Sequence, residues 1–131
     1  MKLKIETSRR VELIDITSEV QEEIRKNEIT EGMCLISTQH TTAAIIINEN
    51  ESGLKEDILN LLNKLVPVGA GYRHDRIDNN ADSHLRAMLL GTSEALPVSG
   101  GKLELGTWQR IFFAEMDGPR NRTVNLTLLK A

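Results

Sequence analysis

The last third of the chain constrains the fold most, because four strand-like segments follow one another there at short intervals. The segments are Glu94 to Val98, Lys102 to Leu105, Gln109 to Met116 and Thr123 to Leu129. Turns that contain glycine or proline separate them, and this arrangement is typical of antiparallel sheet. We therefore predict a closing run of antiparallel strands.

The first part of the chain predicts four more strands. Lys2 to Thr7 and Val11 to Thr17 alternate apolar and polar residues, and Ser8-Arg9-Arg10 between them is predicted as a hairpin connection. Met33 to Thr38 and Ala43 to Asn48 also have the character of strands. These two are predicted to be joined or bent at residues 39–42.

Three helices are predicted, near residues 18–28, 53–65 and 82–90. The second has a predicted buried stripe and ends at Pro67; the stripe consists of Leu54, Ile58, Leu61, Leu62 and Leu65. In the third, Leu85, Met88 and Leu89 are predicted to face the core, and Asn80 or Asp82 to cap the start. The fold class is therefore α+β, with mainly antiparallel sheets packed with about three helices in one domain over residues 1–131.

Composition excludes several classes of function. The net charge is −3 and aromatic residues make up 3% of the 131 residues, which argues against nucleic-acid binding. The longest apolar run, residues 43–47, is too short to cross a bilayer, so no membrane partner is expected. Cys34 is the only cysteine and lies among apolar residues, which predicts a buried, inert thiol and a cytoplasmic protein.

The three histidines are the strongest candidates for chemistry. His40, His74 and His84 each lie beside hydroxyl or acidic side chains. Imidazoles oriented by carboxylates serve in metal ligation and in proton transfer. We therefore predict that the three converge on one pocket that binds a divalent metal, with zinc the best guess. The alternative is that they are surface histidines in polar loops.

Other polar segments predict a site for a phosphorylated ligand. Residues 68–81 lack apolar periodicity, which is typical of a binding loop or a solvated loop. The backbone of Ser99-Gly100-Gly101 is a candidate anion nest, or only a hairpin turn. Arg120 and Arg122 are candidate phosphate ligands, although a solvated basic turn explains them equally well. Trp108 is predicted to pack in the core or to floor a ligand pocket.

Three stretches carry a resemblance to a known family. They are His40 to Ala44 with Asn48-Glu49-Asn50, Asn80 to Leu85, and Gly101 to Ile111 with its Leu-Gly-Thr-Trp-Gln string. Together they resemble the YjbQ-like family over essentially the whole chain. The resemblance implies an α+β fold, a homotrimer and secondary thiamine-phosphate synthase activity. It also implies that Glu49, Asp75 and Asp82 lie near the histidines, and we predict that these carboxylates act in catalysis, either by orienting the metal ligands or as a general base. Trp108 and Gln109 are candidate substrate-binding residues.

The chemistry of the implied reaction leaves alternatives open. A thiamine-phosphate synthase joins a hydroxymethylpyrimidine diphosphate to a thiazole phosphate with loss of pyrophosphate, which suits magnesium or arginines on the leaving group. Three histidines suit zinc better. A metal-dependent hydrolase of a small phosphorylated metabolite and a non-catalytic small-anion-binding protein are therefore competing functions.

Overall fold

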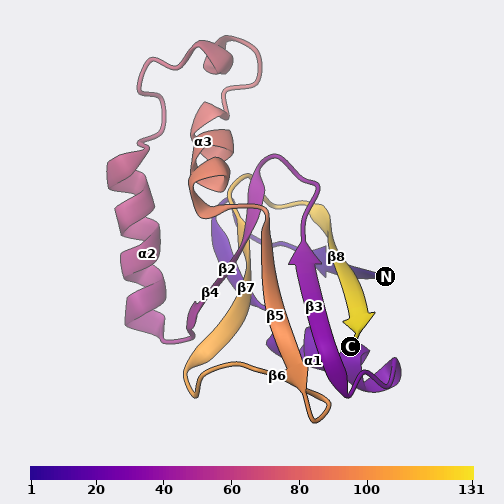
Figure 1. The fold of residues 1–131 in the computed structure, drawn as a ribbon. Coiled ribbons are helices and arrows are strands. Elements are labelled where there is room, and N and C mark those ends of the chain that lie inside the picture. The colour runs from indigo at the N-terminus through magenta and orange to yellow at the C-terminus, as the bar shows by residue number, and fades with distance from the viewer.

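The computed structural model describes residues 1–131 and contains two antiparallel sheets (Figure 1). The larger sheet has the strand order β1-β8-β3-β5-β6, and the smaller has the order β2-β7-β4. The strands are β1 (Lys2–Glu6), β2 (Glu12–Asp15), β3 (Glu31–Ser37), β4 (Ala43–Glu49), β5 (Ser93–Ser99), β6 (Lys102–Leu103), β7 (Gln109–Glu115) and β8 (Asn121–Lys130). The predicted α+β class with mainly antiparallel strands is confirmed.

Three α-helices and one short 3-10 turn complete the fold. They are α1 (Thr17–Lys26), α2 (Ser52–Leu65), η1 (Arg73–Arg76) and α3 (Ala81–Leu90). Figure 1 shows α2 and α3 together on one side of the strands, with the segment that contains η1 connecting them. The three predicted helices therefore exist close to their predicted bounds.

The main core lies between the two sheets and α1. Its 16 buried residues come from both sheets and from α1, and include Ile24, Ile36 and Phe113. A second cluster of 6 residues, which includes Leu62 and Phe112, joins the smaller sheet to α2. Because adjacent residues of β7 point to opposite faces, this strand is buried on both sides. That explains why consecutive apolar residues, Ile111 to Ala114, occupy its middle.

The predicted hairpin at residues 8–10 is wrong. β1 pairs with β8 in the larger sheet, whereas β2 pairs with β7 in the smaller sheet. The connection therefore carries the chain from one sheet to the other. Alternation along the chain predicts strands, but it does not distinguish two strands that pair with each other from two that pair elsewhere.

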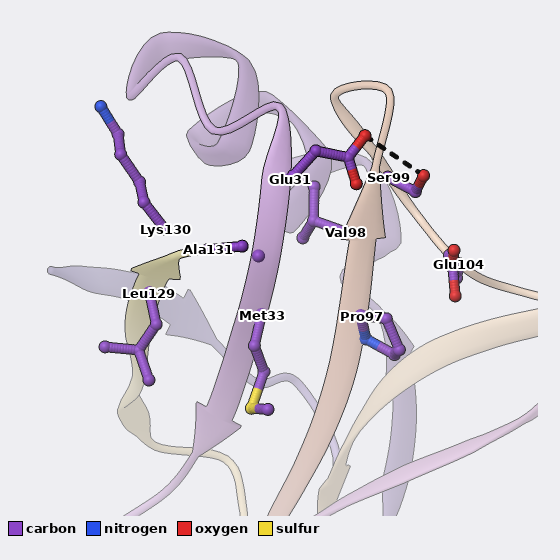
Figure 2. Close-up of a pocket in the computed structure, with 10 residues that line it drawn as sticks. Glu31, Met33, Pro97, Val98, Ser99, Glu104, Leu129, Lys130 and Ala131 are labelled. Carbon is purple, nitrogen blue, oxygen red and sulfur yellow. Dashed lines mark hydrogen bonds between the residues drawn. The ribbon is translucent and has the colours of Figure 1, made fainter.

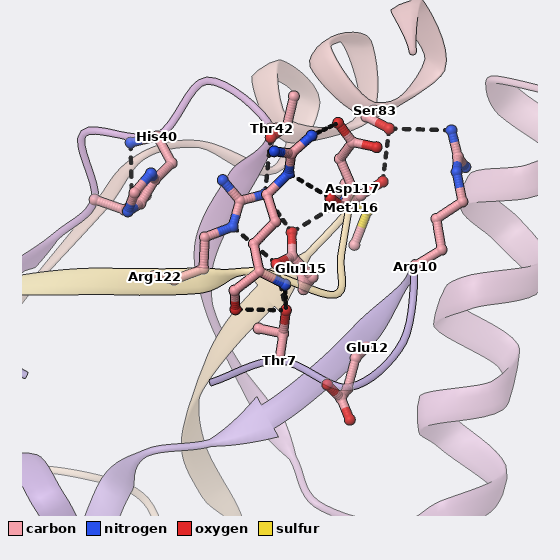
Figure 3. Close-up of polar contacts among 12 residues, drawn as sticks. Thr7, Arg10, Glu12, His40, Thr42, Ser83, Glu115, Met116, Asp117 and Arg122 are labelled. Carbon is pink, nitrogen blue, oxygen red and sulfur yellow. Dashed lines mark hydrogen bonds and ion pairs between the residues drawn. The ribbon is translucent and has the colours of Figure 1, made fainter. Parts of the chain in front are cut away.

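A buried ion pair connects the two sheets (Figure 3). Arg122 on β8 donates from Nε to Oε1 of Glu115 on β7 at 2.8 Å, and the two side chains are only 5% and 0% exposed. Thr7 donates to the same carboxylate at 2.7 Å, and Thr42 accepts from Arg122 at 2.8 Å. The charges are thus neutralised and hydrogen-bonded within the core, which a buried pair requires.

The faces of α2 and α3 differ from the prediction. Leu61 and Leu65 are 54% and 62% exposed, and Met88 and Leu89 are 68% and 56% exposed. The spacing of apolar residues therefore predicts the helices correctly. The predicted burial is confirmed for Leu62 and in part for Ile58, but it is wrong for these four residues within one chain. Large exposed apolar side chains that gather on neighbouring elements mark a surface suited to contact with another molecule.

Two further expectations have a clear outcome. Cys34 is buried, and burial raises the pKa of its thiol to about 11, as expected for an unreactive side chain. None of the helices combines the length and the apolar character that crossing a membrane requires.

We expect the loss of one partner of the Glu115–Arg122 pair to be strongly destabilising. Replacing Glu115 by Gln leaves a buried guanidinium without its counter-charge and should lower the free energy of unfolding by about 3 kcal/mol or more. The double variant E115Q/R122M removes both charges and should lose less than the sum of the single changes. Urea denaturation at one fixed protein concentration measures these values.

The exposed pair Glu22–Arg25 provides the matched control for this experiment. Because solvent screens it, Glu22→Gln should lower the free energy of unfolding far less than Glu115→Gln does. Equal losses for E22Q and E115Q would contradict a special role for the buried pair.

Candidate functional site

Polar side chains gather at one end of the molecule, which we call the histidine end. It consists of the β3–β4 connection, η1, the start of α3 and the turn between β7 and β8. Hydrogen bonds tie these parts together: Met116 N donates to Thr42 O at 3.1 Å, and Ser83 Oγ donates to Met116 O at 2.6 Å. The site is thus assembled from segments far apart in the sequence.

His74 and His84 are in contact at this end. Their ring centroids lie 4.7 Å apart with the rings nearly perpendicular, at 82°. Nε2 of His74 is buried and makes no hydrogen bond, although the side chain as a whole is 40% exposed. Its nearest carboxylate oxygen, on Asp78, is 3.9 Å away, which is too far for a hydrogen bond. This imidazole nitrogen therefore has no hydrogen-bond partner within the chain.

Asp82 at the start of α3 is held by two arginines. Arg10 donates to both of its carboxylate oxygens, at 2.8 and 3.0 Å, and Nη1 of Arg86 lies 3.8 Å away. Burial opposes ionisation of Asp82, but the hydrogen bonds from Arg10 outweigh it, so its pKa is lowered. A carboxylate in this state is a poor general base. Arg10 thus engages both carboxylate oxygens, and the catalytic role of Asp82 stays a prediction.

Asp75 and Asn80 organise the start of α3. Asp75 accepts from the Ala81 N–H at 2.9 Å and so caps the helix from a distance, whereas the side chain of Asn80 makes no capping bond. Asn80 therefore occupies the predicted N-cap position, but Asp75 supplies the capping acceptor. Asn80 instead donates to Asp117 at 2.9 Å, which leaves its Oδ1 buried without a partner. This oxygen and Nε2 of His74 are the two buried side-chain polar atoms of the chain that lack a hydrogen bond.

His40 occupies a different position from the other two histidines. Its Nε2 accepts from the Thr123 N–H at 3.0 Å, beside the Glu115–Arg122 pair (Figure 3). Burial and the nearby charge of Arg122 lower the pKa of its imidazole. No group of three or more His, Cys, Asp or Glu side chains in the chain is placed to hold a metal ion. The predicted three-histidine site is therefore not formed within one chain.

Comparison with known proteins agrees with the fold and the motifs. The family model for UPF0047, YjbQ-like, matches residues 1–131. The chain belongs to this family. A UPF0047 protein from Archaeoglobus fulgidus is 57% identical over 124 residues, which cover 95% of this chain and 96% of the relative. YugU from Bacillus subtilis is 39% identical, with 97% of this chain and 96% of YugU covered.

Solved structures of YjbQ-like relatives have the same fold. A YbjQ-like protein from Sulfolobus solfataricus superposes with a TM-score of 0.97 at 42% identity, and the match covers 100% of this chain and 96% of that protein. A hypothetical protein from Aeropyrum pernix gives the same TM-score and identity, with 98% of its chain covered. The resemblance inferred from the motifs is thereby confirmed at the level of family and fold.

Two predicted phosphate-binding elements of this YjbQ-like chain are engaged within the protein. Arg122 is committed to Glu115 and Thr42. In the Ser99-Gly100-Gly101 turn, Gly100 N–H donates to the Glu31 carboxylate at 3.0 Å and Gly101 N–H donates to Thr30 O at 3.0 Å. The nest therefore holds an anionic group, but that group is the chain's own glutamate. Of the predicted phosphate-binding elements, Arg120 alone stays accessible, being 54% exposed and bonded to Asp117.

The remaining predicted residues lie at the opposite end of β4 and β7. Glu49 ends β4 and pairs with Gln109, the first residue of β7. Gln109 accepts from the Gly106 N–H at 2.8 Å and so shapes the turn that presents Trp108. Trp108 is 71% exposed, so it is not a core residue. Within one chain, the predicted site residues therefore lie in two separate groups, one at each end of β4.

Sequence reasoning missed Arg10 and Gly118. Arg10 contacts Asp82 across 72 residues, and no local acidic neighbour in the sequence indicates this pairing. A Cβ atom at Gly118 would lie 2.2 Å from the Arg9 carbonyl oxygen, and Gly118 N donates to Arg10 O at 3.0 Å. The Asp-Gly-Pro turn was visible as a turn signal, but its role in holding the Arg10 segment depends on this close approach.

We expect acid to destabilise the fold through His40. Since its folded pKa lies below the ordinary value of 6.5, its contribution to stability is complete above pH 6.5 and is lost as pH falls. Protonated Nε2 cannot accept from Thr123 and is repelled by Arg122. The free energy of unfolding, measured by urea denaturation at pH 7.5 and pH 5.5, checks this expectation.

The control for this measurement is His40→Gln, because a glutamine side chain has an acceptor oxygen that does not titrate. The decrease in stability between the two pH values should be smaller in H40Q than in the wild type. An equal decrease in both proteins would show that His40 is not responsible.

Proposed function

We propose that the histidine end binds a small phosphorylated metabolite and that the chain is an enzyme with secondary thiamine-phosphate synthase activity. The observation that carries the proposal is the His74–His84 pair, with its buried Nε2 that lacks a partner. Leaving a buried polar atom without a hydrogen bond is costly, so such atoms usually have an external partner. Asn80 Oδ1, in the same segment, supports the same conclusion.

Arginines around the pair supply the anion recognition. Arg73 and Arg76 flank His74 on η1 and are exposed, and Arg120 is exposed on the neighbouring turn. Guanidinium groups bind phosphate oxygens in a bidentate manner and keep their charge at any physiological pH. These three arginines are therefore better placed for a phosphate group than the buried Arg122.

The proposed reaction depends more on stabilising charge on the leaving group than on covalent catalysis by the protein. The carbon–oxygen bond between the pyrimidine methylene and the diphosphate breaks, a carbon–nitrogen bond to the thiazole forms, and pyrophosphate leaves. Negative charge develops on the leaving pyrophosphate, where arginines stabilise it. An imidazole of the histidine pair can donate a proton to the same oxygens.

A divalent metal fits this end only in part. His74 and His84 are two imidazole ligands, whereas a catalytic zinc site uses three protein ligands. We therefore propose that a metal, zinc or else magnesium with a diphosphate substrate, takes these two histidines from one chain and its other ligands from a second subunit. When bound, such a metal would polarise phosphate oxygens.

Assembly as a homotrimer is part of the proposal. The exposed apolar residues Leu61, Leu65, Met88 and Leu89 on α2 and α3 support it. A second apolar surface contains Met33, Pro97 and Leu129 on neighbouring strands β3, β5 and β8, along a groove of about 470 Å³ (Figure 2). Surfaces of this kind are usual at subunit contacts. Light scattering that reports a stable monomer at micromolar concentration would contradict this part.

A non-catalytic small-anion-binding protein of the cytoplasm is the second candidate function. The hydrogen bond from Thr123 N to His40 favours it, because this histidine then serves as an acceptor and not as a metal ligand. Binding of inorganic phosphate without turnover of any phosphorylated metabolite would support this candidate. Metal-dependent release of phosphate from such metabolites would instead identify a hydrolase.

We expect His74→Ala and His84→Ala each to lower the rate of thiamine-phosphate formation by about a hundredfold or more, because each removes half of the pair. The assay supplies the pyrimidine diphosphate and the thiazole phosphate to protein stripped of metal and then restored with zinc or magnesium. Both thiamine phosphate and pyrophosphate are measured, so that synthesis is distinguished from hydrolysis.

Asp78→Asn is the matched control, since Asp78 is 62% exposed on the same segment and lies beyond hydrogen-bond distance of His74. D78N should keep nearly the wild-type rate, and H74A and H84A should keep the wild-type circular dichroism spectrum. If the folded histidine variants synthesise thiamine phosphate as fast as the wild type, the proposal is wrong.

A further inference from the structure

A second hollow lies at the far end of β4, where β4 ends and β7 begins. It encloses about 280 Å³ and is lined by Asp15, Glu49, Asn50, Thr107, Trp108 and Arg110. The histidine end adjoins Ala43, the first residue of β4, and Glu49 is its last residue. Six steps along an extended strand span about 20 Å, so the two sites are separate within one chain.

Trp108 forms one side of the hollow. It is the only tryptophan of the chain and is 71% exposed. The turn that carries it is closed by Gly106 N–H to Gln109 Oε1 at 2.8 Å and by Gln109 N–H to Gly106 O at 3.1 Å. An indole held outward on a closed turn leaves a large flat surface available for stacking.

Asp15 and Arg110 also line the hollow and neutralise each other. Arg110 Nε donates to Asp15 at 2.7 Å, and Asn50 Nδ2 donates to the same oxygen at 2.9 Å. Burial of Asp15 opposes its ionisation, but the hydrogen bonds from Arg110, Thr17 and Asn50 outweigh it and lower its pKa to about 2. Asp15 therefore stays charged and paired, so it contributes no net charge to the hollow.

Glu49 is the unpaired group. The residue is half-buried, and its carboxylate takes part in no hydrogen bond or ion pair, whereas its backbone N–H donates to Asn48. The hollow thus contains one uncompensated carboxylate beside an exposed indole. A negative charge next to an aromatic face is the combination that selects a cationic, flat ligand.

We infer that this hollow binds a planar aromatic cation, such as an amino-substituted heteroaromatic ring, which stacks on Trp108 and donates to the Glu49 carboxylate. The volume suits a single small ring. Arg110 lies on the side of Asp15 and discourages a second positive charge there. The inference depends on the hollow alone and does not require the proposed activity at the histidine end.

The single tryptophan makes the test specific. We expect the emission of Trp108 in the intact, assembled protein to be that of a solvent-exposed indole and to be quenched saturably by 4-aminopyridine, a planar cation at neutral pH. Isonicotinate, which has a similar size but is an anion, and cyclohexylamine, a cation without an aromatic ring, should produce no saturable quenching. Emission typical of a buried indole, or equal quenching by all three compounds, would overturn the inference.

Two variants assign the binding to the proposed groups. Glu49→Gln keeps the shape of the side chain but removes its charge, and should weaken binding of 4-aminopyridine by about tenfold. Glu19→Gln, on the exposed face of α1, is the matched control and should bind as the wild type does. Unchanged affinity in folded E49Q would overturn the inference.

Trp108→Leu tests stacking without fluorescence. Saturation-transfer NMR should detect 4-aminopyridine bound to the wild type and to E19Q, but not to W108L. An undiminished signal in W108L, with its circular dichroism spectrum unchanged, would show that the ligand does not stack on the indole.

Discussion

The Glu115–Arg122 ion pair is the interaction on which the arrangement of the two sheets depends. It joins β7 of the smaller sheet to β8 of the larger, and Thr7 and Thr42 complete its hydrogen bonds from two other connections. A charged pair in an apolar core is stable only in one geometry, because any slip leaves a buried charge without its partner. The pair therefore sets the relative position of the strands around it. His40 is placed by the same region, through the N–H of Thr123, the residue after Arg122.

The position of the Glu115–Arg122 pair also determines how the polar side chains at the histidine end are arranged. The turn after β7 holds Asn80 through Asp117 and Ser83 through Met116, so the start of α3 is fixed to the core. Arg10 then neutralises Asp82, and Asp75 caps the helix. Two buried side-chain atoms at this end, Nε2 of His74 and Oδ1 of Asn80, have no hydrogen bond. The ligand site is inferred from these two atoms.

The two ends of β4 offer different chemistry. At its start, arginines and a histidine pair suit an anion, whereas at its end an exposed indole and an unpaired carboxylate suit a flat cation. The YjbQ-like motifs of the sequence are divided between these ends: His40 and the segment with His84 lie at one, and the Gly-Thr-Trp-Gln string with Glu49 lies at the other. Large apolar residues are also exposed on α2, α3 and β3.

The sequence by itself determined the α+β class, the three helices and most strand positions, because apolar periodicity and turn residues act over a few neighbouring positions. It also indicated the family, through strings such as Leu-Gly-Thr-Trp-Gln. Only the tertiary structure decided that β1 and β2 belong to different sheets, that Arg122 is buried with Glu115, and that Glu49 and Trp108 lie far along β4 from the histidines. Each of these facts depends on contacts between residues distant in sequence, as with Arg10 and Asp82. A local sequence pattern does not show which of several charged residues will pair with a given buried group.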